Sequence, residues 1–203
     1  MKFDRSQKNC QNRVMAVQQR TLKTRAKLLE AAKGLIETGG YEALRVEDVV
    51  RDAGVAKGTF FAHFADKDAL MDQLIGAEIN GFLDQISELA TPQNIDDLLE
   101  ALMPSLLFMC QERFVFDVIL RHSGAAANDK IGTIAQTFMR HGAVVARWLA
   151  EGPFRKDISP ALLAEGVGAF QIQAVALKFC AMHNEIELRE RMRTYLNAWL
   201  LPT

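Results

Sequence analysis

Side chains that can bind a polyanion gather in one short stretch of the chain. Arg45, Lys57 and Lys67 carry positive charges, while Thr59 offers a hydroxyl and His63 a ring nitrogen. Cations and hydroxyl groups contact phosphate oxygens and also reach base edges in nucleic acid. Taken one at a time, the lysines are better explained as solvated surface charges and the histidine as a structural residue. Only their joint pattern favours a nucleic-acid interface.

The distribution of charge supports this interpretation. Residues 1–67 contain 13 Lys and Arg against 8 Asp and Glu, whereas residues 68–203 contain 11 against 17. A basic end on an acidic body is typical of a protein with one polyanion-facing surface. Opposed only by Asp4, the first basic residues are Lys2, Arg5, Lys8, Arg13, Arg20, Lys23, Arg25 and Lys27. We interpret residues 1–20 as a basic, flexible arm that either contacts DNA or only keeps the protein soluble.

Other functional classes lack their characteristic motifs. No phosphate-binding glycine loop, HExxH motif or paired-carboxylate arrangement is present, and the four histidines are isolated, so we expect no enzyme, cofactor or metal site. Cys10, Cys110 and Cys180 form no CxxC pair, which argues against a disulfide framework. No apolar run reaches roughly 18 residues and no secretory signal is recognised, so we expect a cytoplasmic protein without a membrane segment.

Helical periodicity dominates the sequence and predicts an all-α fold. Gly39-Gly40 is expected to end a helix, Gly54 to allow a tight turn between two helices, and Ser159-Pro160 to begin a helix. About nine helices are expected, near residues 21–38, 46–53, 57–64, 67–89, 93–110, 113–122, 129–150, 160–182 and 185–201. The first three form a candidate DNA-binding domain over residues 21–67, and the others a second domain over residues 68–203.

Residues 46–64 show the pattern helix, glycine turn, helix. Each of these two helices is too short to be stable alone, so both must pack on the preceding helix. Leu35, Val49 and Phe60 are expected in the shared core, and Phe64 is assigned to the core as well. A pair of this kind places its second helix in the major groove of DNA.

This part of the chain resembles the TetR family of repressors. The similarity covers about residues 24–75 and rests on GYEAL at Gly40–Leu44, DAGVAKGTFFAHF at Asp52–Phe64 and DKDAL at Asp66–Leu70. Beyond residue 75 it is only architectural. The resemblance implies a helical ligand-binding and dimerisation domain over residues 68–203. It also implies a homodimeric repressor that leaves its double-stranded DNA operator when a small molecule binds.

The resemblance assigns DNA contacts to Arg45, Lys57, Gly58, Thr59, Phe61, His63 and Lys67. Gly58 lets the backbone approach DNA closely, and Lys67 presents a cation at the amino end of a helix. Phe61 departs from the family pattern, because it replaces a tyrosine whose hydroxyl reaches phosphate, at about 1–2 kcal/mol per half-site. Ala56 replaces a capping serine, at about 1 kcal/mol of helix stability. Arg45 likewise replaces a capping threonine.

The last two helices are expected to form the dimer interface. Small residues in the eighth helix allow close approach, and the apolar faces suit a four-helix interface with two helices from each subunit. The expected interface residues are Leu163, Val167, Phe170, Ala174, Leu188, Met192, Tyr195 and Trp199. Ordinary core packing is the alternative explanation for much of this set.

A ligand cavity among the fifth to eighth helices also follows from the resemblance. Its candidate wall residues are Met103, Phe108, Phe114, Phe116, Phe138, Trp148 and Phe170, and its candidate polar residues are Arg121, His122, His141, Gln171 and Gln173. Core packing explains most of the aromatic residues, and the polar ones gain interest if they are buried. The composition favours an apolar or aromatic effector. Two alternatives stay open: an enzyme, and a helical ligand-binding module that has lost DNA binding through the departures at Phe61 and Ala56.

Overall fold

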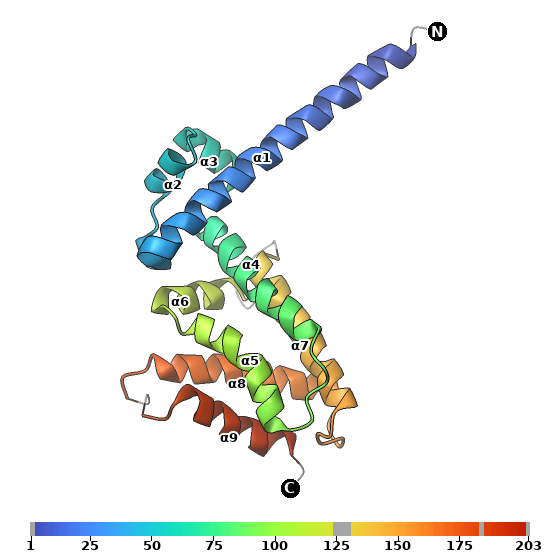
Figure 1. Cartoon of the computed structure of the whole chain (residues 1–203), viewed down its shortest axis with the longest axis vertical. Helices are drawn as coiled ribbons and strands as arrows, with labels where there is room; N and C mark the ends of the chain where they lie inside the picture. The colour runs from blue at the N-terminus through green and yellow to red at the C-terminus, as the bar shows by residue number, and fades with distance from the viewer. Residues whose placement is uncertain (1–2, 124–130, 183–184, 202–203) are drawn as a thin grey trace. The chain divides into compact units, whose positions relative to one another are not determined.

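A computed structural model describes residues 3–123, 131–182 and 185–201, with side chains from residue 15 onward. Within these ranges the protein has nine helices and no strand, which confirms the predicted all-α fold (Figure 1). They are α1 (Phe3–Ala43), α2 (Val46–Asp52), α3 (Lys57–His63), α4 (Lys67–Ser87), α5 (Ile95–Met109), α6 (Arg113–His122), α7 (Thr133–Glu151), α8 (Pro160–Lys178) and α9 (Leu188–Leu200). The chain divides into two compact units, Met1–Leu70 and Met71–Thr203, and α4 runs from the first into the second.

The amino-terminal unit is a three-helix module with glycines at its turns. Gly40 has a φ of 80° and interrupts the helical backbone near the end of α1, while Gly54 has a φ of 65° between α2 and α3. Both values lie in the left-handed region, which glycine adopts because it lacks a Cβ. Leu28, Val49 and Phe60 are fully buried and supply one core residue from each helix.

The amino-terminal end of α1 corrects the sequence prediction. Residues 1–20 were expected to form a flexible arm, with a helix from Thr21, but α1 begins at Phe3. Residues 3–20 contain neither glycine nor proline and are rich in Gln, Arg and Lys, which lose little rotamer freedom in a helix. The described side chains between Met15 and Leu22 are exposed, and Figure 1 shows this part of α1 projecting past α2 and α3. The scarcity of apolar residues therefore indicates a helix without a packed face.

Helices α7, α8 and α9 pack in succession in the carboxy-terminal unit, and α5 packs on both α8 and α9. Side-chain caps begin two of these helices. Asn94 Oδ1 accepts the Asp97 amide at 2.8 Å at the start of α5, and Ser159 Oγ accepts the Leu162 amide at 3.4 Å at the start of α8. Each cap satisfies a backbone donor that has no partner within its helix.

Several helix ends differ from the predicted ones by a few residues. Helix α4 ends at Ser87 instead of 89, and α8 ends at Lys178 instead of 182. Helix α9 begins at Leu188 instead of 185, and the predicted start of α7 at 129 lies outside the described residues. These ends depend on burial. Leu188 at the start of α9 is 5% exposed, whereas Met182, beyond the end of α8, is 81% exposed and would gain no packing from a longer helix.

Helix α8 bears on the expectation that the chain has no membrane segment. Its 19 residues include only two charged side chains, so by length and composition it could cross a bilayer. Its packing between α7 and α9 gives this apolar composition another explanation, since a helix in the interior of a folded domain is apolar for the same reason.

Candidate nucleic-acid interface and internal cavity

Helix α3 has a buried face and an exposed face. Phe60 is fully buried and Phe64, which follows the helix, is 3% exposed. Phe61 is 49% exposed, and its ring meets that of Phe60 edge-on, with the centroids 5.3 Å apart. Gly58 and Lys57 are exposed as well, and a Cβ built at Gly58 would meet no atom within 4 Å. The apolar face therefore anchors α3 and leaves the opposite face open to a partner.

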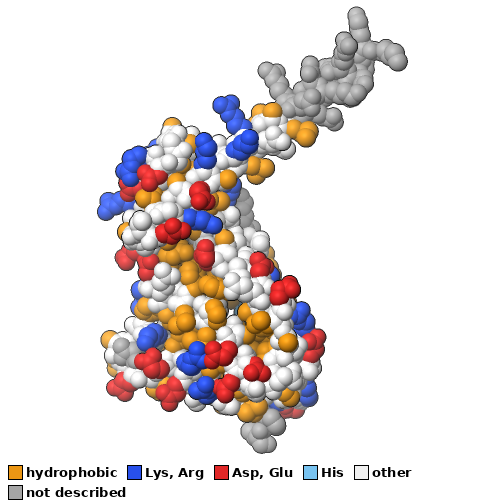
Figure 2. Space-filling model, in the orientation of Figure 1, with side chains coloured by type: hydrophobic (Ala, Val, Ile, Leu, Met, Phe, Trp, Pro, Cys, Tyr) orange, Lys and Arg blue, Asp and Glu red, His pale blue; other side chains and the backbone are white. Residues whose placement is uncertain are grey.

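The cations near this face are engaged with groups of the protein itself. Lys57 Nζ lies 2.6 Å from Glu47 Oε1, and hydrogen bonding from this ammonium lowers the pKa of Glu47. Both side chains are more than half exposed, and such a pair exchanges partners at little cost. Figure 2 shows basic and acidic side chains interspersed around α2 and α3. The ammonium of Lys57 can therefore turn from its carboxylate to a phosphate.

Lys67 has a different setting at the start of α4. Its Nζ donates to the Glu42 carbonyl at 3.1 Å, and partial burial lowers the pKa of Lys67. The first turn of α4 is capped by Asp66, whose Oδ1 accepts the Ala69 amide at 2.7 Å. Lys67 is thus tied to the end of α1 and is less free than Lys57 to reach outward.

The remaining residues predicted to contact DNA differ in their exposure to solvent. Arg45 is exposed immediately before α2, whereas Thr59 and His63 on α3 are half-buried. Neither Arg45 nor Ala56 makes a side-chain cap to the helix that follows it. The loss of both family caps is therefore present in the structure.

Arg25 is a contributor whose role the sequence reasoning missed, because it was counted only as a basic residue of the arm. Its Nη1 donates to the His63 carbonyl at 2.7 Å, and its guanidinium lies 4.2 Å from the centre of the Phe64 ring. Arg25 thus ties α1 to the carboxyl end of α3, where a cation is favourable. A signal was available, since Arg25, Leu28 and Ala32 share one face of α1 at helical spacing.

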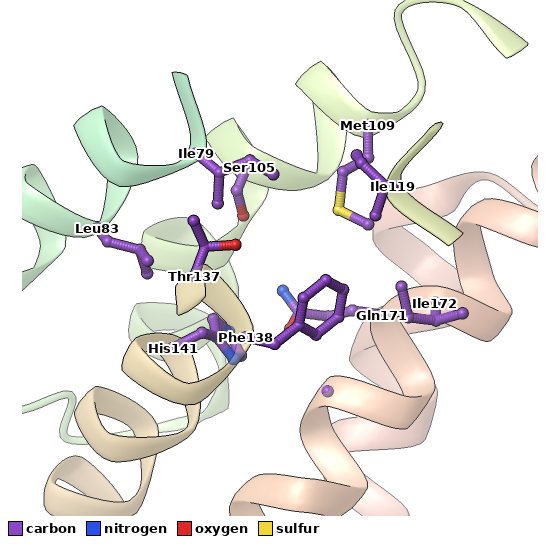
Figure 3. Close-up of a pocket in the computed structure, with 11 residues that line it drawn as sticks. Ile79, Leu83, Ser105, Met109, Ile119, Thr137, Phe138, His141, Gln171 and Ile172 are labelled. Atoms are coloured by element: carbon purple, nitrogen blue, oxygen red, sulfur yellow. The ribbon is translucent and has the colours of Figure 1, made fainter. Parts of the chain in front are cut away.

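The carboxy-terminal unit encloses a small cavity of about 50 Å³ (Figure 3). Its wall is drawn from α4, α5, α6, α7 and α8, and is formed by Ile79, Leu83, Ser105, Met109, Ile119, Thr137, Phe138, His141, Gly168, Gln171 and Ile172. Among the predicted pocket residues, Phe138, His141 and Gln171 line it, while Met103, Phe108, Phe114, Phe116, Arg121, His122, Trp148, Phe170 and Gln173 do not.

The polar groups of this wall are sparse. His141 Nε2 is buried and has no hydrogen-bond partner among the described residues. Desolvation lowers the pKa of His141 to about 4, so the ring is neutral at pH 7. Gln171 is 6% exposed, and Thr137 donates its hydroxyl to the Ile134 carbonyl at 2.7 Å. The cavity is therefore an uncharged, mainly apolar space with a few hydrogen-bonding groups.

Known proteins resemble this chain both in its amino-terminal segment and over most of its length. Residues 28–74 match the family model "Bacterial regulatory proteins, tetR family". Over 116 residues the chain is 31% identical to the HTH-type transcriptional regulator YvdT of Bacillus subtilis, covering 55% of this chain and 59% of that protein. Over 185 residues it is 23% identical to the regulator SAB2452 of Staphylococcus aureus, covering 88% and 94%.

The fold comparison extends beyond the matched segment. Thermus thermophilus FadR, a TetR-family transcriptional repressor in complex with lauroyl-CoA, superposes with a TM-score of 0.61 at 16% identity, over 86% of this chain and 92% of that one. The chain belongs to the TetR family of transcriptional regulators. At this identity the FadR likeness concerns the fold alone, and FadR's ligand is not carried over by it.

In this TetR-family protein, most of the predicted dimer residues are buried within the protomer. Leu163, Val167, Ala174, Leu188 and Met192 are at most 5% exposed, and they hold α8 and α9 in the protomer core. Phe170, Tyr195 and Trp199 are half-buried and mutually adjacent, with the Phe170 ring 5.0 Å from that of Tyr195 and 6.1 Å from that of Trp199. Of the eight predicted dimer residues, these three keep part of their surface exposed in the protomer.

Helix α4 of this TetR-family protein is attached to α7 along its length. The buried Asp72 accepts the amides of Thr133 and Ile134 at 2.8 and 3.0 Å, and therefore caps the amino end of α7. Further along, Arg140 of α7 donates to the Asn80 side chain at 3.1 Å and to Asp84 at 2.6 Å. The sequence reasoning missed Asp72, because its role depends on which helix ends beside it.

His122 and the other predicted pocket residues have definite places outside the cavity. His122 Nδ1 lies 3.8 Å from Asp72, near the amino end of α7. Trp148 is fully buried, and the Phe108 ring packs 5.7 Å from that of Phe82. Arg121 is exposed at the end of α6. These residues belong to packing, to helix ends and to the surface.

Proposed function

We propose that this protein is a ligand-responsive repressor. It binds a double-stranded DNA operator as a homodimer in the cytoplasm and releases it when a small molecule occupies the cavity. The observation that carries the proposal is the two-sided α3, whose Phe60 face is buried while Lys57, Gly58 and Phe61 stay exposed. An anchored helix with an open face suits the major groove. The proposal involves no catalytic step.

Contact with DNA begins from the exposed side of the amino-terminal domain, residues 21–67. Lys57 exchanges Glu47 for phosphate, Gly58 admits the sugar–phosphate backbone, and Thr59 offers its hydroxyl to phosphate or a thymine methyl. Arg45, His63 and Lys67 supply further contacts at the edges of the surface. Residues 3–20 add positive charge along the projecting part of α1.

Dimerisation is assigned to the half-buried aromatic group of α8 and α9. Phe170, Tyr195 and Trp199 present partly exposed rings, and Leu162, which like Phe170 lies on α8, is 50% exposed. Two copies of this face form a four-helix interface, in which the same residues meet across a two-fold axis. The dimer then sets the spacing of the two α3 helices on the operator.

The route from effector to DNA runs through α4. Ile79 and Leu83 of α4 line the cavity, and the same helix begins at Lys67, four residues after α3 ends at His63. An effector that displaces α4 at these two residues also moves the amino end of this helix. The DNA-binding module, which precedes that end in the chain, is then reoriented. DNA affinity falls only to the extent that the effector prefers the displaced state. An apolar or aromatic effector suits the cavity wall.

Fluorescence anisotropy tests this function with labelled DNA from the promoter beside the protein's own gene. We expect a sequence-specific complex that weakens as salt rises. Thr59→Ala should weaken specific binding by about tenfold, since it removes one hydrogen bond per half-site. Thr38→Ala is the control, because Thr38 is exposed on α1 and its hydroxyl bonds only to carbonyls of its own helix.

Two outcomes would reject the assignment of α3. The first is the absence of any specific complex, which would favour a helical ligand-binding module without DNA binding. The second is unchanged affinity in Thr59→Ala. In both variants sedimentation should show the same dimer as in the unaltered protein.

A further inference from the structure

We propose that the cavity is a recognition site for a neutral, largely apolar molecule bearing one hydroxyl group, which hydrogen-bonds to His141. The inference rests on the proposed function, because it names the chemical class of the effector in that same cavity. Its starting point is the His141 ring, whose Nε2 is buried without a partner among the described residues and faces the cavity beside Phe138 (Figure 3).

An unpartnered buried nitrogen is costly. Removing a polar atom from water without a hydrogen bond is unfavourable, and the great majority of buried polar groups in native proteins have a partner. A ligand group that meets Nε2 restores the missing bond. Because burial keeps the ring neutral, Nε2 is either a donor or an acceptor, depending on the tautomer. A hydroxyl group satisfies both cases, since it donates and accepts.

The wall supplies a second polar group and no charge. Gln171 on α8 is 6% exposed and lines the same cavity, so its amide lies within the wall that meets the ligand. None of the eleven lining residues is Asp, Glu, Lys or Arg. An ionised ligand would lose its hydration without gaining a counter-charge, and the wall therefore selects a neutral molecule.

Space for the apolar part of the ligand lies between α7 and α8. A groove of about 760 Å³ shares Phe138, His141, Gly168 and Ile172 with the cavity. A Cβ at Gly168, or at Gly142 on the groove wall, would meet no atom within 4 Å, so both glycines leave the passage open. The enclosed space alone is smaller than typical ligand sites of roughly 300–1,000 Å³. The hydroxyl end therefore binds inside, and the apolar body extends into the groove.

Calorimetric titration of the full chain at pH 7 with three matched probes tests the class. 1-Naphthol carries the hydroxyl, naphthalene lacks it, and 1-naphthoate replaces it with a charge. We expect 1-naphthol to bind about tenfold more tightly than naphthalene, which corresponds to one hydrogen bond made to a buried group. We expect 1-naphthoate to bind most weakly. Equal binding of naphthol and naphthalene, or tighter binding of naphthoate, would overturn the proposal.

Two variants locate the site. His141→Leu should abolish the preference for naphthol over naphthalene while retaining naphthalene binding. Gly168→Leu should weaken both probes, because the new side chain fills the shared passage. Trp148→Phe is the control for the first, since it also removes a buried unpartnered N–H, but one outside the cavity. Gly81→Leu is the control for the second, because Gly81 has open space and does not line the cavity.

The variants also separate this inference from the function on which it rests. If His141→Leu keeps the tenfold preference, the His141 site is wrong, whatever the protein does on DNA. If promoter DNA is not bound in the absence of any probe, the regulatory function fails even where naphthol binds as expected. A circular dichroism melt confirms that each variant is folded.

Discussion

The two units of the molecule handle polar groups in opposite ways. In the amino-terminal unit Lys57 is exposed on α3, and its cation is held by an exposed carboxylate from which it can depart. In the carboxy-terminal unit Gln171, Asp72 and the Nε2 atom of His141 are buried, and Asp72 has two backbone partners while His141 Nε2 has none among the described residues. An exposed polar group can leave its partner for a DNA phosphate at little cost in free energy. A buried polar group that loses its partner costs much more.

This contrast indicates that the two units have different functions. The outward surface is suited to reversible, salt-sensitive contact with a large polyanion. The buried groups are suited to a small ligand and to fixing α4 against α7, where each hydrogen bond is shielded from water. Substitutions should therefore change affinity in the first unit and stability in the second.

The largest effect is expected at Asp72. Asp72→Ala leaves two amides at the start of α7 without their acceptor, so the free energy of unfolding should fall by about 3 kcal/mol. Urea unfolding of the variant measures this loss. Asp84→Ala is the matched control, because Asp84 pairs with Arg140 at the surface, and its unfolding curve should stay close to that of the unaltered protein. Similar losses in the two variants would contradict the contrast between buried and exposed groups.

The next effect is the dependence of stability on pH that comes from His141. Its pKa is about 4 in the folded protein and near 6.5 when unfolded, so the unfolded chain takes up a proton first as the pH falls. The contribution is intact above pH 6.5 and is lost as the pH falls toward 4. The loss amounts to about 3 kcal/mol, at 1.36 kcal/mol for each pH unit.

Urea titrations across that range check the His141 effect. The curve of stability against pH should be flatter in His141→Leu than in the unaltered protein, because the substituted chain has no proton to take up at this position. Parallel curves would show that His141 titrates normally in the folded state and is not buried as described.

The smallest effect on the fold is expected at Lys57. Lys57→Ala should leave the unfolding midpoint unchanged, because the lost ion pair is exposed. It should nevertheless weaken DNA binding about equally for all sequences and reduce the salt slope by about one per half-site. Arg51→Ala serves as the comparison, since Arg51 is an exposed cation on α2 paired with Asp48. Anisotropy at several salt concentrations would refute the assignment if the two variants had equal slopes.

Local signals account for what the sequence predicted well. Gly40, Gly54 and Ser159 mark the ends of helices through backbone preferences and capping, which act within a few residues. The alternation of buried Phe60 and exposed Phe61 on α3 also follows from helical spacing. These features need no knowledge of distant partners.

What could not be predicted depends on contacts between helices far apart in the chain. The cavity combines residues from five helices, and among them the sequence had pointed only to Phe138, His141 and Gln171. Arg25 and Asp72 acquire their roles from a carbonyl and two amides at remote helix ends. The apolar faces of α8 and α9 were assigned to a dimer, but Leu163 and Met192 are used within the protomer, because periodicity cannot tell which neighbour covers a face.

The central claim is that the exposed face of α3 binds DNA, and a pair of glycine substitutions tests it most directly. Gly58 and Gly34 are both exposed helical positions where a Cβ meets no atom within 4 Å, so Glu fits at either without disturbing the packing. Gly58→Glu places a carboxylate against the phosphates, whereas Gly34→Glu places it on α1. In anisotropy titrations with promoter DNA, we predict a loss of at least about 100-fold for Gly58→Glu and little change for Gly34→Glu, since like charges across an interface cost several kcal/mol. Full affinity in the folded Gly58→Glu dimer would contradict the account.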